Sequence, residues 1–230
     1  YAAHYCTLIT QQRVYQAGFA HVGVTHKADH RHPGLGPGLA ALAPALFHLG
    51  QLLSQCVDAG VDLFIIETMT DLAEIKAAVL ACRENSDLPV FATMTFEEDG
   101  RTFLGTSPEV AAITLDAIGA DVLGINCSQG PAELRGLAAR MLTVTDKPVM
   151  VQANAGLPHV DDDGNTVFDI QAPEYAEAVA GMIADGVSVV GGCCGTTPAH
   201  MAALRTLIDN HTPSPRHRKP SMSVTSAQTV

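Results

Sequence analysis

The feature that most constrains the fold is a pattern that recurs five times in the central part of the chain. A short apolar run rich in β-branched residues ends in small or polar residues, and an amphipathic stretch of helical length follows it. Such runs are typical of parallel strands buried on both faces, and strict alternation with helices indicates an α/β fold. The predicted strands span residues 62–66, 89–94, 121–125, 148–152 and 187–190, and the predicted helices span residues 71–83, 107–118, 131–142, 172–184 and 197–208.

Five such units do not complete an eight-unit barrel. A (β/α)8 barrel needs about 250 residues, or about 31 for each unit, whereas this chain has 230 residues. Residues 1–60 leave room for two more units at most, with a predicted strand at 19–24 and a predicted helix at 40–57. We therefore expect a (β/α)8 TIM barrel that is incomplete on its N-terminal side.

Composition excludes several classes of partner. All but one of the acidic residues lie within 53–210, and the net charge is −11, which argues against nucleic acid and anionic membranes. No apolar run reaches the length of a transmembrane helix. The adjacent Cys193 and Cys194 suggest thiolate chemistry in a reducing compartment, so we expect a cytoplasmic protein.

Residues with reactive or metal-binding side chains follow three alternate strands of the predicted sheet. Glu67 follows the first strand, Cys127 follows the third, and Cys193 and Cys194 follow the fifth. In a barrel, alternate strands contribute to the same internal layer, so their ends converge at one mouth. Three converging thiolates suit Zn²⁺, and three protein ligands leave a fourth position open, as in catalytic zinc sites. The spacing of Cys127, Cys193 and Cys194 is therefore consistent with a zinc site.

Spacing alone leaves other interpretations open. Adjacent cysteines in a Gly-rich strand exit are also consistent with a redox role, and Cys127 with a small buried apolar side chain. The Gly-rich segment 191–197 before a helix is also typical of phosphate-binding loops. A barrel aldolase needs a Schiff-base lysine at a strand end, which neither Lys76 nor Lys147 provides. Residues 161–165 predict a turn, because their glycine does not sit where a calcium loop needs it.

Several motifs in a fixed order resemble the homocysteine S-methyltransferase family. Residues 124–128 and 190–198 resemble the family's zinc signature, and residues 66–71, 94–102, 105–108 and 154–158 match further motifs. More narrowly, they resemble the homocysteine-binding domain of cobalamin-dependent methionine synthases. The resemblance implies that Cys127, Cys193 and Cys194 are the zinc ligands and that Glu67 binds the homocysteine ammonium. It also counts Asn126, beside the metal, with the substrate-binding residues, and implies no catalytic residue beyond the metal site.

The resemblance implies zinc-dependent methyl transfer to the thiolate of L-homocysteine, which forms methionine. The implied cofactors are Zn²⁺ and methylcobalamin, the latter being a methyl carrier bound by another domain. The implied partners are downstream folate- and cobalamin-binding domains of the same parent chain, with neither nucleic acid nor membrane involved. Residues 1–52 are then an atypical N-terminal segment at the third barrel strand, 53–210 the homocysteine-binding zinc barrel domain, and 211–230 a linker toward a downstream domain.

The early part of the chain departs from the family pattern. The Asp-Gly-Ala-Met-Gly-Thr-like and Thr-Asn-Thr-Phe-like loops that open the family's barrel are absent, and residues 24–27 stand where a Gly-Pro-Thr-Gly-like strand exit is usual. These loops help to hold homocysteine, so the sequence predicts a fragment or a wrongly started chain. Two alternatives stay open: a stand-alone homocysteine methyltransferase that uses betaine or S-methylmethionine, and a catalytically inactive zinc-binding fragment.

Overall fold

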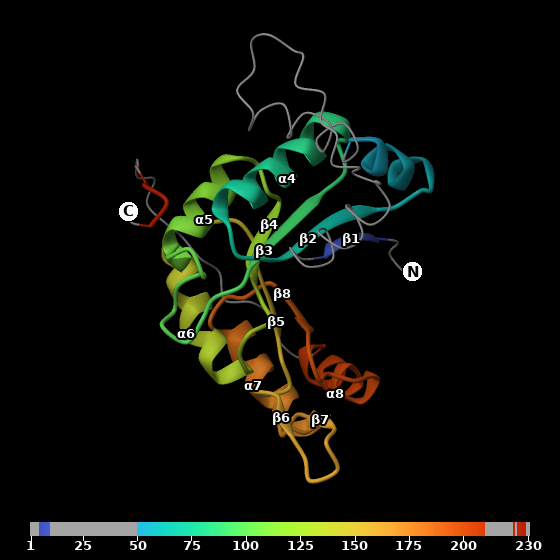
Figure 1. Ribbon diagram of the computed structural model, residues 1–230, viewed down its shortest axis with the longest axis vertical. Helices are drawn as coiled ribbons and strands as arrows, with labels where there is room; N and C mark the ends of the chain where they lie inside the picture. Colours follow the sequence, from blue (N-terminus) through green and yellow to red (C-terminus); the bar gives the residue numbers. More distant parts are fainter. Residues whose placement is uncertain (1–4, 10–49, 210–222, 224, 229–230) are drawn as a thin grey trace, which may run out of the picture.

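A six-stranded parallel sheet lies at the centre of the computed structural model, which describes residues 5–9, 50–209, 223 and 225–228 (Figure 1). The strand order is β1-β2-β3-β4-β5-β8, so the sheet follows the order of the chain. The strands are β1 (Tyr5–Ile9), β2 (Leu63–Met69), β3 (Val90–Met94), β4 (Val122–Asn126), β5 (Val149–Ala153) and β8 (Val189–Gly192). The five strands predicted in the central part are confirmed.

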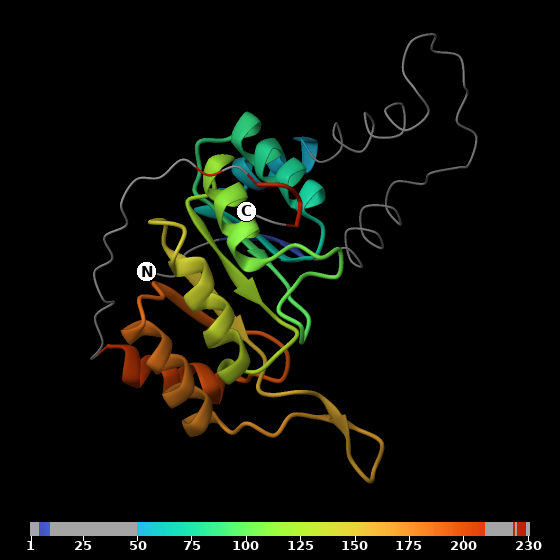
Figure 2. The same cartoon turned by 90° about the vertical axis from the view of Figure 1, so that its left-hand side faces the viewer.

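Helices connect the strands on the outside of the sheet, as the alternating pattern predicts (Figures 1 and 2). They are α4 (Leu72–Asn85), α5 (Pro108–Ala117), α6 (Pro131–Leu142), α7 (Ala172–Ala184) and α8 (Pro198–Ile208). Their starts are encoded locally. The Asp71 carboxylate accepts a hydrogen bond from the backbone N–H of Ala73, and a proline occupies the first helical turn of α5, α6, α7 and α8.

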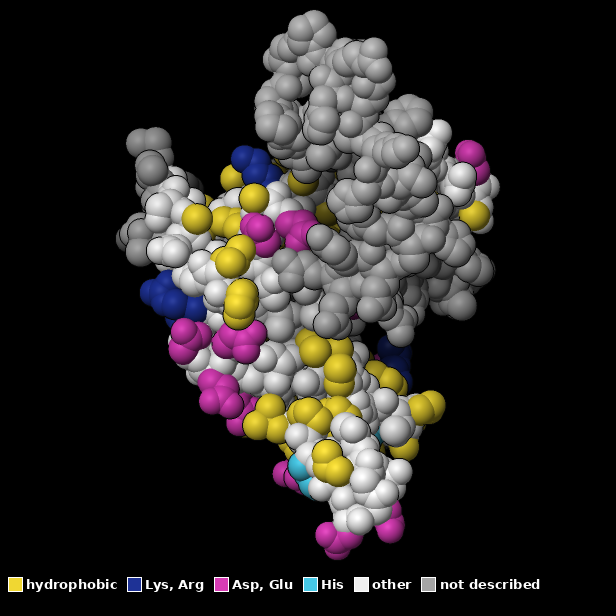
Figure 3. Space-filling model, viewed as in Figure 1, with side chains coloured by type: hydrophobic (Ala, Val, Ile, Leu, Met, Phe, Trp, Pro, Cys, Tyr) yellow, Lys and Arg dark blue, Asp and Glu magenta, His cyan; other side chains and the backbone are white. Residues whose placement is uncertain are grey.

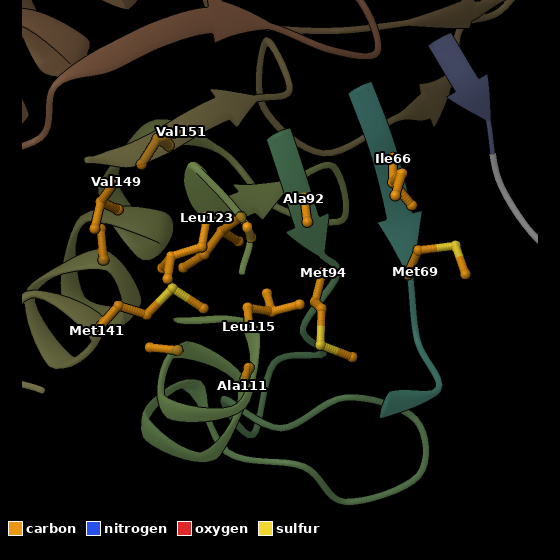
Figure 4. Close-up of a cluster of buried hydrophobic side chains, with 14 of the residues drawn as sticks. Ile66, Met69, Ala92, Met94, Ala111, Leu115, Leu123, Met141, Val149 and Val151 are labelled. Atoms are coloured by element: carbon orange, nitrogen blue, oxygen red, sulfur yellow. The ribbon is translucent and has the colours of Figure 1, made fainter. Parts of the chain in front are cut away.

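The core lies between the sheet and these helices. Leu123 of β4 lies beside Leu115 of α5 and Met141 of α6, and all three side chains are fully buried (Figure 4). Burying one such side chain contributes about 1.5–3 kcal/mol. This packing fixes the carboxyl ends of the strands, where the predicted site residues lie.

Two features were not predicted from the sequence. β1 pairs in parallel with β2 along its whole length, from Tyr5 opposite Leu63 to Ile9 opposite Glu67. A small hairpin of β6 (His159–Val160) and β7 (Thr166–Val167) projects from the region after β5 (Figure 2). Its connection contains the turn predicted at 161–165.

Some predictions fall on residues that the structure does not describe. The strand at 19–24 lies outside the described residues, as do residues 211–222 of the linker. Of the helix predicted at 40–57, the described part is helical over residues 50–58.

The described helices give no sign of a membrane span, because none is both long and apolar enough to cross a bilayer. Acidic side chains are spread over the visible face, as expected from the net charge of −11 (Figure 3).

Candidate metal centre

Three cysteine sulfurs converge at the carboxyl end of the sheet. The Sγ atom of Cys194 lies 3.7 Å from that of Cys127 and 4.0 Å from that of Cys193, and all three lie within 4.8 Å of one another. Cys127 follows β4 directly, and the other two follow β8. The structure thus brings together the three cysteines that the alternate-strand argument placed at one mouth. Among the described residues, they form the one group of three or more His, Cys, Asp and Glu that could hold a metal ion.

The backbone of Cys127 is held in an unusual conformation. Cys127 and Ser128 have φ angles of 65° and 66°, in the left-handed region that non-glycine residues rarely occupy. Two backbone hydrogen bonds hold this turn: the N–H of Cys127 donates to the carbonyl of Gln152 (3.0 Å), and the N–H of Gln129 donates to the carbonyl of Cys127 (2.8 Å). Such strain costs about 1–3 kcal/mol for each residue, and it concentrates at functional sites.

The Cys193–Cys194 turn is anchored on the residues that follow β5. The N–H of Cys193 donates to the carbonyl of Ala153 (2.8 Å), and the N–H of Cys194 donates to Oδ1 of Asn154 (3.1 Å). Gly195 closes the turn with a φ of 77°, and a Cβ there would lie 2.2 Å from the ring of Phe168. Only glycine fits this position, so the turn that presents both sulfurs depends on it.

Asn126 connects the ends of several strands to one sulfur. Its Oδ1 accepts from the N–H of Thr68 (2.7 Å) and from Oγ1 of Thr93 (2.7 Å). Its Nδ2 donates to Oγ1 of Thr68 (2.6 Å) and lies 3.9 Å from Sγ of Cys193. The side chain is fully buried. The structure therefore places Asn126 behind the sulfurs, in contact with β2 and β3, where it orients Cys193.

Glu67 lies in an irregular part of β2. The pairing of β2 with β3 shifts register between Ile66 and Met69, and Thr68 has a φ of 61°. Such a bulge redirects side chains. Glu67 is half-buried, and its pKa lies above the usual 4.5, first because of burial and second because of the nearby Cys127, while a hydrogen bond from Gln152 opposes the shift. Because Glu67 is on β2 and Gln152 on β5, this contact spans the interior of the curved sheet.

The three thiols have different acidities. The pKa of Cys127 is lowered to about 6, chiefly because the thiol of Cys193 donates a hydrogen bond to its thiolate, with further donation from the Ser128 N–H, Cys194 and Asn154. The pKa of Cys193 is raised first by the hydrogen bond that its thiol donates to Cys127 and then by burial. The pKa of Cys194 is raised first by burial and then by the negative charge on Cys127. One thiolate is therefore favoured, and full ionisation of the trio needs a compensating cation.

The donor set fits zinc. At a Zn–S distance of about 2.3 Å, tetrahedral coordination places neighbouring sulfurs about 3.8 Å apart. The two Sγ separations that involve Cys194, 3.7 Å and 4.0 Å, are close to that value. Cys194 is exposed, so the trio remains open to solvent.

Sequence reasoning assigned no role to Asn154 or Gln152. Asn154 is 3% exposed and contacts both cysteine segments, through the N–H of Cys194 and the thiolate of Cys127. Gln152 contacts Glu67 and has a buried Oε1 without a hydrogen-bond partner. The available signal was their position at the end of β5, between the two cysteine-bearing strand ends.

Comparison with known proteins agrees with this geometry. The family model for homocysteine S-methyltransferase matches residues 30–208. The chain belongs to the homocysteine S-methyltransferase family. Among curated members related to it, the methionine synthase of Mycobacterium tuberculosis (strain ATCC 25618 / H37Rv) is 39% identical over 160 residues, and that of Mycobacterium leprae (strain TN) is 39% identical over 158 residues. These matches cover 67% and 66% of this chain but only 13% of each relative.

Solved structures show the fold of the family. The homocysteine methyltransferase MmuM from Escherichia coli, in its apo form, superposes with a TM-score of 0.55 at 22% identity, over 70% of this chain and 57% of that one. Its metallated form gives a TM-score of 0.52, over 74% and 58% of the two chains. The (β/α) barrel fold predicted from the sequence is therefore confirmed, and the described strands form part of it.

Proposed function

We propose that this chain holds Zn²⁺ through Cys127, Cys193 and Cys194 and catalyses methyl transfer to the thiolate of L-homocysteine, which forms methionine. The observation that carries the proposal is the convergence of three sulfurs within 4.8 Å at the carboxyl end of the sheet. Membership of the family and the similarity to methionine synthases support the choice of substrate.

Each polar residue around the sulfurs has a defined task in this proposal. When bound, zinc lowers the pKa of the substrate thiol and so supplies a thiolate nucleophile at neutral pH. Glu67 binds the substrate ammonium, and Asn126 and Asn154 hold the cysteine side chains in place. The substrate sulfur forms the new bond to the methyl carbon, while the donor keeps the electron pair of the bond that breaks.

We further propose that the methyl carrier is methylcobalamin, held by another domain of a longer parent chain that also binds folate. Support comes from the curated relatives, which are methionine synthases of which this chain spans 13%. The exposed and half-buried free thiols require reducing conditions, which favours the cytoplasm.

Elemental analysis and zinc-edge X-ray absorption of the purified chain, with and without L-homocysteine, test the metal and the substrate together. We expect one zinc per chain with three sulfur neighbours, and a fourth sulfur when homocysteine is added. Zinc with three sulfurs that does not respond to homocysteine would support the inactive-fragment alternative. Absence of zinc would overturn the metal assignment.

A second assay identifies the donor. The zinc-loaded chain is incubated with L-homocysteine and with methylcobalamin, betaine or S-methylmethionine, and methionine is measured by mass spectrometry. We expect methionine with methylcobalamin. Turnover with only one of the other two donors would identify a stand-alone methyltransferase instead.

A further inference from the structure

The C-terminal tail of the chain contacts a turn far away in the sequence. Residues 225–228, here called the tail, lie beside α5 in both ribbon views (Figures 1 and 2). Oγ1 of Thr106 donates to the carbonyl of Ala227 (2.8 Å), and Nη1 of Arg101 donates to the carbonyl of Gln228 (3.2 Å). Nε2 of Gln228 donates to the carbonyl of Leu104 (3.4 Å). Main-chain and side-chain groups of the tail are thus both recognised.

The turn at residues 101–106 is organised by its own hydrogen bonds. The N–H of Thr102 donates to the carbonyl of Thr106 (2.9 Å), and the N–H of Gly105 donates to the carbonyl of Thr102 (2.7 Å). Nη1 of Arg101 also donates to the carbonyl of Gly105 (2.7 Å), so the guanidinium is held by the turn as well as by the tail. A binding surface that is ordered in this way loses little conformational entropy when it receives a peptide.

A glycine provides the contact surface for the tail side chain. A Cβ on Gly105 would lie 3.1 Å from Nε2 of Gln228 and 3.6 Å from its Cγ, so the Gln228 side chain packs on the bare backbone. Gly105 also has a φ of 87°, which side-chain-bearing residues rarely adopt. The turn therefore presents both a conformation and a close approach that depend on glycine.

We propose that the 101–106 turn is a docking site for the chain's own residues 225–228. The site accepts a bent segment that offers two successive carbonyls, those of Ala227 and Gln228, and a glutamine side chain. Because Ser107 caps α5, docking anchors the tail at the N-terminal end of that helix. In a chain as long as the matched methionine synthases, this anchor would fix the point from which the following polypeptide departs.

Backbone ¹⁵N heteronuclear NOE measurements on the full zinc-loaded chain test the docking. We expect values for residues 225–228 close to those of the helices. Gln228→Ala changes only the tail and leaves the barrel intact, and Thr106→Val removes the hydroxyl donor. Each loses one hydrogen bond, which lowers the ratio of docked to free tail by about fivefold, so the values should fall. The matched control is Thr143→Val, because the Thr143 hydroxyl bonds only to Arg140 of its own helix end.

Three outcomes decide the proposal. Reduced values in both tail-site variants, with native values in the control, support it. Values typical of a free chain end in the native protein overturn it, as do native values in Gln228→Ala. Because the measurement reads motion of the tail and not turnover, its result is independent of whether the chain methylates homocysteine.

Discussion

Asn126 shows how a single buried amide can organise the cysteine cluster. It satisfies the Thr68 N–H and the Thr93 hydroxyl and also reaches Cys193. In Asn126→Ala these groups lose their partner inside the protein, so we expect the free energy of unfolding to fall by about 2–3 kcal/mol. Because the orientation of a ligand is lost as well, zinc affinity should fall by about 10- to 100-fold.

A chelator competition titration and urea denaturation measure the two effects of Asn126→Ala. Asn165→Ala is the matched control, because Asn165 bonds only within the exposed hairpin turn and should leave zinc affinity unchanged. If Asn126→Ala keeps native zinc affinity, the Asn126 amide stabilises the fold but does not orient a zinc ligand.

Glu67 illustrates a conflict between stability and binding. The pKa of Glu67 is raised above 4.5, so the ionised carboxylate is less favourable in the folded state than in the unfolded state. The free energy of unfolding therefore falls as pH rises from 4.5 through the folded-state pKa. Glu67→Gln should therefore be more stable than the native chain at pH 7, and the difference should vanish at low pH, where Glu67 is protonated. The same change removes the proposed partner of the substrate ammonium, so homocysteine affinity should fall by about 10- to 100-fold.

Urea denaturation between pH 4 and 8, together with calorimetric titration of L-homocysteine, checks these expectations for Glu67→Gln. The matched control is Glu109→Gln, because the pKa of Glu109 is lowered to about 2 and its neutralisation should destabilise the protein at pH 7. If Glu67→Gln leaves homocysteine affinity unchanged, Glu67 does not bind the substrate ammonium.

At the scale of single elements, the turn after β8 depends on one glycine. Gly195→Ala introduces a Cβ only 2.2 Å from the Phe168 ring at a φ of 77°. We expect a loss of about 2 kcal/mol or more in stability and weaker zinc binding, because Cys193 and Cys194 move. Gly136→Ala is the control: Gly136 is exposed within α6 with nothing within 4 Å, so alanine should stabilise the helix by about 0.5–1 kcal/mol. Thermal unfolding with and without zinc gives the Tm of Gly195→Ala and of Gly136→Ala. Equal Tm values and equal responses to zinc in the two variants would contradict a special role for Gly195.

The contact between α5 and α6 includes a bidentate ion pair between Arg140 and Glu109. Nε and Nη2 of Arg140 donate to the two carboxylate oxygens of Glu109, at 2.6 Å and 2.8 Å. The pKa of Glu109 is lowered from 4.5 to about 2, so the stabilisation is complete above pH 4.5 and is lost as pH falls toward 2. Because Arg140 is 41% exposed, solvent screening reduces the effect, and we expect Arg140→Met to cost about 1 kcal/mol at pH 7.

Urea denaturation of Arg140→Met at several pH values measures how much the ion pair contributes to the free energy of unfolding. The loss caused by Arg140→Met should become smaller below pH 4.5. Arg135→Met is the matched control on the same helix, because the pair of Arg135 with Asp185 is more exposed and should contribute less. A pH-independent cost would mean that Arg140 acts through packing of its stem alone.

The elements that the sequence predicts are those with strong local signals. α6 and α7 have the predicted bounds because proline and amphipathic periodicity mark them, and the central strands are marked by continuous apolar runs. β1 was missed because Tyr5–Ile9 becomes a strand only by pairing with β2, which lies far away in the chain. The convergence of the cysteines followed from barrel topology, but the left-handed backbone at Cys127 is imposed by tertiary hydrogen bonds that no local pattern encodes.

At the scale of the whole molecule, the cysteine trio joins distant parts of the barrel. Cys127 and Cys194 are 67 residues apart in the chain, and β5, the hairpin, α6 and α7 all lie between them. A metal that holds both ends stabilises only the folded state, because the unfolded chain does not bring the thiols together. Zinc binding and folding of this half of the barrel should therefore be coupled.

This coupling can be measured as a zinc-dependent increment in stability. At a free zinc concentration of 100 times Kd, we expect the free energy of unfolding to rise by about 2.7 kcal/mol and Tm by about 5–10 °C. Cys194→Ser should lose most of this increment. Cys82→Ala, which truncates a fully buried cysteine outside the trio, should lower the starting Tm yet keep the increment. Differential scanning calorimetry in the presence of zinc or of a chelator measures the zinc-dependent rise in Tm for each variant. If that rise survives in Cys194→Ser, zinc binds at another site.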